Sequence, residues 1–306
     1  MAEIQPFNDL VSVVIPVYNR TQEVKRAIQS VLNQNHQNFE ILVVDDGSEE
    51  DIKSVCNNFD DERIRFFRNE THTNANRARN IGILNSRGEY IAMLDSDDEF
   101  LPGHIERRLK KIKEWDCDGI FGSAYYFDGI TEKLMLSRPL KEGELMINYL
   151  LSDGFAQTST YFLKKMVARE ILWDETLERH QDFDFTVRFV AKYKFYSDYE
   201  PTVRRYGDIG KERDYKLDSC IKFINKHRDS ISKSVYNNYH RQIYRRIASY
   251  ESKKYVKYYA LNSYKYIYFV SFNDFLTVHR KLHIFRILIF LKFIFLHISA
   301  FMGRSE

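Results

Sequence analysis

The first hundred residues alternate between short apolar runs and segments with a helical pattern. Residues 11–16, 41–44 and 90–94 are runs of mostly β-branched and aliphatic side chains, as expected for buried strands. The segments between them, residues 21–32 and 75–85, have the pattern of helices. Strands that alternate with helices in this way predict an α/β fold, with a mostly parallel, Rossmann-like central sheet flanked by helices on both faces.

Polar residues follow these predicted strands, at the point where each strand ends. In a parallel sheet, ligands bind outside the carboxyl ends of the strands, so these residues are candidates for a binding site. Taken alone, each group could equally be a plain connection between a strand and a helix. The candidates after the first two strands are Pro16, Val17, Tyr18, Asn19, Asp45 and Asp46.

Two of these groups suit a nucleotide. The ring of Tyr18 can form one wall of a flat pocket for a base. Either Asp45 or Asp46 can accept a hydrogen bond from a base N–H or a ribose hydroxyl, since adjacent carboxylates repel each other unless they are exposed or bonded to donors. The same pair could also serve as a helix cap and turn.

The run at residues 90–94 leads into three carboxylates within four residues, at positions 95–98. Residues two apart in an extended segment point the same way, so Asp95 and Asp97 are expected to converge. Converging carboxylates are unfavourable without a cation, and oxygen ligands favour Mg²⁺ or Mn²⁺. An EF-hand is excluded, because its loop needs a Gly at the sixth position that this segment lacks.

Two further segments carry candidate residues. The predicted helix at residues 75–85 contains Arg77 and Arg79, which point in different directions if Ile81 and Leu84 face the core. One of these arginines could therefore clamp a pyrophosphate, and a solvated helix face is the alternative. Farther along, Asp182 opens another predicted helix, where it could be a helix cap or a general base.

The chain changes character near residue 215. Residues 1–215 carry 29 Lys and Arg against 38 Asp and Glu, whereas residues 216–306 carry 17 against 5. The second part is predicted to be a mostly helical, basic extension that suits an anionic partner such as a membrane surface, and no motif favours nucleic acid. Its apolar end, residues 284–302, predicts a membrane-surface helix, with a buried helix and a full span as alternatives.

Together and in this order, the polar groups resemble the motifs of family 2 glycosyltransferases of GT-A fold, a group that contains many bacterial polysaccharide enzymes. The resemblance covers roughly residues 10–210. It rests on five segments, residues 13–19, 41–48, 78–82, 94–98 and 181–184.

The resemblance implies a role for each matching residue in binding the donor. The residues that would border the nucleobase are Pro16, Val17, Tyr18 and Asn19. Either Asp45 or Asp46 would bond to the base, and Arg79 would lie by the pyrophosphate. Asp95 would lie near the ribose.

It also implies the reacting groups. Asp97, with Asp95, would form the DxD element that holds Mn²⁺ or Mg²⁺, and Asp97 would be the direct metal ligand. Asp182 matches the family's catalytic base, although Gln181 stands where many relatives have Glu. One base and one displacement would invert the anomeric configuration, and no motif matches the second, nucleophilic carboxylate of a retaining enzyme.

The expected function is therefore transfer of a sugar from a nucleotide-sugar, with UDP as the first choice of nucleotide, to a glycan or lipid-linked acceptor. A nucleotidylyltransferase and a non-catalytic nucleotide-binding module are the alternatives. The widely spaced cysteines and the absence of a secretory pattern favour a cytoplasmic location. With the basic, apolar extension, this predicts a protein at the inner face of the membrane, and an oligomer is compatible with the sequence.

Overall fold

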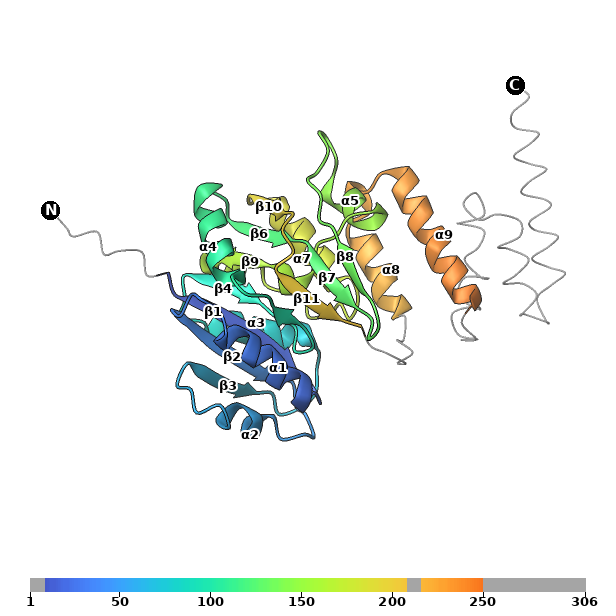
Figure 1. Ribbon diagram of the computed structural model, residues 1–306. Helices are drawn as coiled ribbons and strands as arrows, with labels where there is room; N and C mark the ends of the chain where they lie inside the picture. The colour runs from blue at the N-terminus through green and yellow to red at the C-terminus, as the bar shows by residue number, and fades with distance from the viewer. Residues whose placement is uncertain (1–8, 208–215, 250–306) are drawn as a thin grey trace, which may run out of the picture. The chain divides into compact units, whose positions relative to one another are not determined.

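A computed structural model describes residues 9–207 and 216–249, in two compact units that divide after Lys226 (Figure 1). The first unit holds both sheets and every predicted site residue. The predicted membrane-surface helix at residues 284–302 lies outside the described residues. None of the helices that the structure describes is long and apolar enough to cross a membrane.

The first unit is built on a seven-stranded sheet with the order β10-β6-β9-β4-β1-β2-β3. Every pairing in it is parallel except those of β9, which runs antiparallel to β4 and β6. The predicted mostly parallel α/β sheet is thus confirmed. Its strands are β1 (Val11–Val17), β2 (Phe39–Asp45), β3 (Ile64–Arg68), β4 (Tyr90–Met93), β6 (Gly119–Gly122), β9 (Phe162–Lys164) and β10 (Phe195–Asp198).

Helices cover both faces of this sheet because successive side chains of each buried strand point to opposite sides. On β1, Val13 and Ile15 pack into one hydrophobic cluster with α1 (Thr21–Leu32) and α4 (His104–Glu114). Val14, between them, packs into a second cluster on the other face. The helices that contribute to the second cluster are α3 (Ala75–Asn85), α5 (Met146–Ser152), α6 (Lys165–Ile171) and α7 (Gln181–Val190).

Helix α3 lies close against β1, and its buried face differs from the prediction. A Cβ atom on Gly82 would come within 2.3 Å of Val14, so only glycine allows this close packing. Ile83 is the buried aliphatic side chain next to Gly82, while Leu84 is 47% exposed and Ile81 is only partly buried. The expectation that Ile81 and Leu84 face the core was wrong, because polar residues occupy much of the buried face.

A second, four-stranded sheet has the order β5-β11-β7-β8. The extended chain at residues 119–127 breaks at Ser123, so that its two halves, β6 and β7, join different sheets. A 3₁₀ turn, Thr158–Thr160, leads into β9 of the larger sheet. The strands of the second sheet are β5 (Glu99–Phe100), β7 (Ala124–Phe127), β8 (Glu132–Met135) and β11 (Val203–Tyr206).

The described residues after 215 are helical, as predicted. Helix α8 (Leu217–Lys226) belongs to the first compact unit, and α9 (Lys233–Ser249) belongs to the second. The first compact unit thus extends to the end of α8, about ten residues beyond the composition change near residue 215. A domain boundary near residue 215 stays a prediction. A short helix, α2 (Ile52–Asn57), completes the first unit between β2 and β3.

Candidate active site

A cavity of about 320 Å³ lies at the carboxyl ends of β1, β2 and β4, where the sequence predicted a ligand site. We call it the edge cavity. The predicted residues that line it are Pro16, Val17, Tyr18, Asp46, Arg79, Asp95 and Asp97. The lining residues that the sequence analysis did not single out are Arg20, His72, Ala75 and Ser96.

Two aromatic rings give the edge cavity a flat wall. The imidazole of His72 stacks on the ring of Tyr18, with centroids 3.8 Å apart and planes 23° from parallel. Tyr18 is 38% exposed, so part of its side chain is open to a ligand. A planar ligand such as a nucleobase can stack on such a surface.

The two adjacent aspartates at the end of β2 have different surroundings. Asp45 is fully buried, and its carboxylate accepts a hydrogen bond from Arg68 at 2.6 Å and one from the Ser48 backbone N–H at 2.9 Å. Asp46 is also buried, but it lines the edge cavity. Its carboxylate accepts hydrogen bonds from the Asn69 amide and the Thr73 hydroxyl at 2.7 Å each, and His72 Nδ1 lies 2.9 Å away. The structure thus places Asp46, and not Asp45, where a base could reach it.

This difference gives a first testable expectation. Asp46→Asn should raise the donor KM about tenfold, because a charge-assisted hydrogen bond is lost, and should also lower the melting temperature, because Asp46 accepts buried hydrogen bonds from Asn69 and Thr73. Asp45→Asn should cost about 1.5–3 kcal/mol of folding stability, because it weakens a buried contact with Arg68, and should leave the donor KM nearly unchanged. Donor titration separates the two roles, and thermal melting establishes that each variant is folded at the temperature used. Equal donor KM values in the two variants would contradict the assignment.

Asn19 has a structural role in the loop after β2 that its position in the sequence did not predict. Its side-chain oxygen accepts hydrogen bonds from the backbone N–H groups of Glu49 at 2.8 Å and Glu50 at 3.4 Å. Its φ of 50° turns the chain sharply between β1 and α1. It is not among the residues that line the edge cavity, so the structure does not place it beside the predicted base site.

Asp95 and Asp97 do face the same space, but the chain between them is not extended. The Asp98 N–H donates to the Asp95 carbonyl at 3.0 Å and closes a turn. Arg79 donates to Asp95 Oδ1 at 2.7 Å, and Arg20 forms an ion pair with the Asp97 carboxylate. The expected convergence is therefore present, and a turn rather than strand alternation produces it.

Helix α3 presents Arg79 to this turn. It begins at Ala75 because the side chain of Asn74 accepts hydrogen bonds from the N–H groups of Asn76 and Arg77. Arg79, one turn farther on, is 3% exposed and reaches Asp95, whereas Arg77 points to solvent. Only one of the two arginines enters the site, as their spacing required.

The third carboxylate of the turn has a different function. Asp98 is 2% exposed and accepts hydrogen bonds from the Ser159 hydroxyl at 2.5 Å and from the Tyr206 N–H at 3.3 Å. Burial, followed by the charges of Asp97 and Asp95, raises its pKa to about 8 against the attraction of Arg205. Asp98 therefore fixes the turn to the neighbouring elements.

A second cavity of about 670 Å³ shares Asp95 and Asp97 with the edge cavity. We call it the inner cavity. Asp182 lines it, as do residues from β11 and from the segment before α7, including Gln157, Glu178, Arg205 and Tyr206. The two cavities therefore meet at the Asp95–Asp97 turn, with Asp182 facing the shared space.

Helix α7 holds Asp182 in a fixed place. His180, with a φ of 59°, turns the chain into the helix, and the first helical bond runs from the Asp184 N–H to the His180 carbonyl. The Phe183 N–H donates to Asp182 Oδ1 at 2.9 Å. Burial raises the pKa of Asp182, while this bond and the charge of Arg79 oppose the rise.

Asp95 and Asp97 each have an arginine partner, Arg79 and Arg20. Burial raises the pKa of Asp97, Asp95 raises it further, and Arg20 opposes both. Within the described residues, no group of three or more His, Cys, Asp or Glu side chains could hold a metal ion. A Mg²⁺ or Mn²⁺ ion at this turn would therefore have to complete its shell with ligand phosphates and water.

Three residues that line the cavities, Arg20, His72 and Arg205, have little in the sequence to mark them as site residues. Arg20 directly follows the turn residue Asn19, and Arg205 lies in β11, where it is one of two adjacent arginines. His72 lies in an irregular segment after β3 that has no pattern of its own. Only the packing of these segments against the cavities shows their importance.

Comparison with known proteins identifies the family to which these motifs correspond. The family model for glycosyl transferase family 2 matches residues 12–172. The amylovoran biosynthesis glycosyltransferase AmsB of Erwinia amylovora is 34% identical over 58% of this chain and 62% of its own length. The putative colanic acid biosynthesis glycosyl transferase WcaA of Escherichia coli K12 is 30% identical over 61% of this chain and 68% of its own length.

Solved structures show the same fold. The crystal structure of S. aureus TarS 1-349 in complex with UDP-GlcNAc matches with a TM-score of 0.59 and 16% identity, over 89% of this chain and 79% of that one. At this identity the match establishes the GT-A fold alone. The chain spans less than two thirds of AmsB, 62% of its length.

Proposed function

The chain belongs to glycosyl transferase family 2, and on that premise we propose that it transfers one sugar from a nucleotide-diphospho-sugar to an acceptor hydroxyl. The sugar would be a hexosyl or N-acetylhexosaminyl group. The acceptor would be a glycan or lipid-linked glycan in bacterial polysaccharide biosynthesis. The observation that carries the proposal is the pair of cavities that share Asp95 and Asp97, with the partly buried side chain of Asp182 facing the shared space.

The edge cavity suits the donor. Tyr18 offers a stacking surface for a base, and Asp46 offers an acceptor for a base N–H. Arg79 and Arg20 bring two positive charges to the floor of the same cavity, where a diphosphate would need them. A UDP-sugar is our first choice of donor, and the TarS structure with UDP-GlcNAc supports it.

Asp97, with Asp95, would hold Mn²⁺ or Mg²⁺ next to that diphosphate. When bound, the cation would supply positive charge that stabilises the leaving nucleoside diphosphate. The chain's own part is to keep both carboxylates in a turn that Arg79 and Arg20 already brace. Arg20 would have to release the Asp97 carboxylate to a cation, so Arg20 and the cation compete for one group.

The inner cavity suits the acceptor, and Asp182 is placed to take the proton from its hydroxyl. A retaining double displacement needs a second free carboxylate near the anomeric carbon. Asp184 is unsuitable, because it is fully buried and bonded to Arg188 and Lys226 at 2.7 Å each. A single displacement with inversion of configuration is therefore the mechanism that the site supports.

A donor panel tests the function. The protein is incubated with UDP-, GDP- and dTDP-sugars and Mn²⁺, with and without EDTA, and released nucleotide is quantified. Release of a nucleoside diphosphate from one donor, lost with EDTA, is the expected result. Release of pyrophosphate would instead indicate a nucleotidylyltransferase. Donor binding without consumption, even with glycan and lipid-linked acceptors present, would indicate a non-catalytic binding module.

The raised pKa of Asp182 predicts the pH dependence of turnover. A general base works in its deprotonated form, so kcat should fall as the pH drops through the pKa of this group. Because burial raises that pKa, the acid limb should lie above pH 3.8, the ordinary value for Asp. A kcat–pH profile, with folding followed by circular dichroism, measures this. Constant kcat in folded protein down to the ordinary value would contradict the role of Asp182.

Location is proposed from the sequence. The 17 Lys and Arg of residues 216–306, against 5 Asp and Glu, favour contact with an anionic membrane at the cytoplasmic inner face. The apolar residues 284–302 would add to that contact. A lipid-linked acceptor would then be presented at the same surface.

A further inference from the structure

One side chain of α1 contacts both the turn that carries Asp97 and the wall of the inner cavity. Arg26 donates from Nη2 to the backbone carbonyl of Asp97 at 2.7 Å. Its Nε lies 3.1 Å from Glu99 Oε1, and its guanidinium carbon lies 3.8 Å from the centre of the Tyr206 ring. Arg26 thus contacts two segments that are far apart in the sequence, residues 97–99 and Tyr206 on β11.

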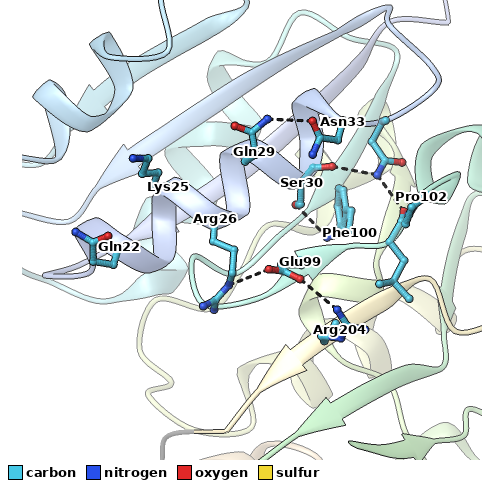
Figure 2. Close-up of a pocket in the computed structure, with 12 residues that line it drawn as sticks. Gln22, Lys25, Arg26, Gln29, Ser30, Asn33, Glu99, Phe100, Pro102 and Arg204 are labelled. Carbon is cyan, nitrogen blue, oxygen red and sulfur yellow. Dashed lines mark hydrogen bonds and ion pairs between the residues drawn. The ribbon is translucent and has the colours of Figure 1, made fainter. Parts of the chain in front are cut away.

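Glu99 links Arg26 to strand β11. Figure 2 shows the Arg26 side chain reaching from α1 to Glu99, and Glu99 continuing to Arg204 on β11. Tyr206, on the same strand, is hydrogen-bonded to Glu99 through its hydroxyl. Glu99 is 18% exposed, so these charged contacts lie partly out of water and are stronger than those of a surface pair.

The position of these contacts matters because Asp97 and Tyr206 face substrates. Asp97 lines both cavities, and Tyr206 lines the inner one. Asp97 is held from two sides, since Arg20 pairs with its carboxylate and Arg26 bonds to its carbonyl. Removing Arg26 would free the carbonyl side of the turn and would also remove the cation that stacks on Tyr206.

We propose that Arg26 is a positioning residue, which holds Asp97 at a fixed position relative to Tyr206 so that donor and acceptor meet in the reactive arrangement. The inference rests on the proposed glycosyl transfer. Arg26 itself lines neither the edge cavity nor the inner cavity, so its effect on the reaction passes through Asp97 and Tyr206. Small displacements of reacting groups are costly, and an error of about 1 Å can lower a rate about 10²-fold.

The neighbouring Lys25 is a matched control. It lies on the same helix and, like Arg26, lines a hollow between α1 and β5, but its side chain is exposed to solvent (Figure 2). Lys25→Ala removes the same positive charge as Arg26→Ala. Arg26→Lys keeps the charge, but an ammonium cannot reproduce the planar fork that bonds to Asp97 while stacking on Tyr206.

The test measures kcat and both KM values for wild type, Arg26→Ala, Arg26→Lys and Lys25→Ala, with the folded fraction of each followed by circular dichroism. We expect Arg26→Ala to lower kcat at saturating donor and acceptor about 10²-fold in fully folded protein. Arg26→Lys should recover only part of the loss, and Lys25→Ala should match wild type. Combining Arg26→Ala with Tyr206→Phe should cost less than the product of the two single losses, because both act through one cluster.

Four results would overturn the inference. Equal kcat in Arg26→Ala and Lys25→Ala would show that Arg26 has no specific role. A loss that follows the unfolded fraction would assign Arg26 to folding, and full recovery with Arg26→Lys would assign it to simple charge. If wild type releases no nucleoside diphosphate from any donor, the proposed function fails and this inference fails with it, which distinguishes that case from the other three.

Discussion

Asp182→Asn lowers kcat by about 10²–10⁴-fold and leaves donor affinity nearly unchanged, which is the expected loss of a general base. The amide has almost the same shape as the carboxylate and can still accept the hydrogen bond from the Phe183 N–H. It cannot take a proton from the acceptor hydroxyl. Donor binding depends on the edge cavity, which Asp182 does not line. Steady-state kinetics and donor calorimetry on the same preparation measure both quantities.

Glu178→Gln is the matched control for this variant. Glu178 also lines the inner cavity, but its side chain is exposed and paired with Lys216 at 2.7 Å. It should therefore tolerate the same chemical change with little loss of kcat. A similar fall in kcat for both variants would mean that the cavity needs negative charge in general. Normal turnover by Asp182→Asn would remove Asp182 from the mechanism.

Asp97→Asn should lower kcat/KM about 10²–10³-fold and abolish the response to added Mn²⁺, because it removes the charged oxygen that a cation and the turn both require. The loss should exceed that of the Asp46 variant, since Asp97 lines both cavities and Asp46 lines only the edge cavity. Titration of Mn²⁺ at fixed donor, with nucleoside diphosphate release as the readout, measures the response.

Asp98→Asn makes the same change one residue along the chain. Burial already raises the pKa of Asp98 to about 8, so at neutral pH its neutral form predominates and an amide resembles it. Asp98 points inward, to Ser159, and lines neither cavity. This variant should keep its response to Mn²⁺. Loss of that response in Asp98→Asn but not in Asp97→Asn would reverse the assignment.

The fold and the place of the site were predictable because both follow from strand chemistry. A parallel strand that is buried on both faces is mostly apolar, and β1 and β2 are recognisable by their runs of aliphatic side chains. The polar residues after such strands then fall at one edge of the sheet, where the edge cavity lies. Neither inference requires knowledge of distant contacts.

Which of two adjacent residues faces the cavity could not be predicted, because this depends on packing between distant segments. Asp45 and Asp46 are chemically identical, and only the positions of Arg68 and His72 separate them. The side chain of Asn19 is used by the loop at residues 48–50, a contact that spans thirty residues.

The buried face of helix α3 and the roles of two arginines also depend on packing that the sequence does not show. The buried face of α3 is largely polar, so hydrophobic periodicity misplaced Leu84. In the sequence, Arg20 before α1 and Arg26 within it look like ordinary surface charges. Their contacts with Asp97 exist only because α1 packs beside the turn that follows β4.

The stereochemistry of the product tests the central claim most directly. Once the donor and an acceptor are identified, the anomeric configuration of the new linkage is read by NMR from the proton coupling at the transferred sugar. One base and one displacement predict the configuration opposite to that of the donor. Retention of the donor's configuration would contradict the account, because it would require a nucleophile that neither Asp182 nor the buried Asp184 supplies.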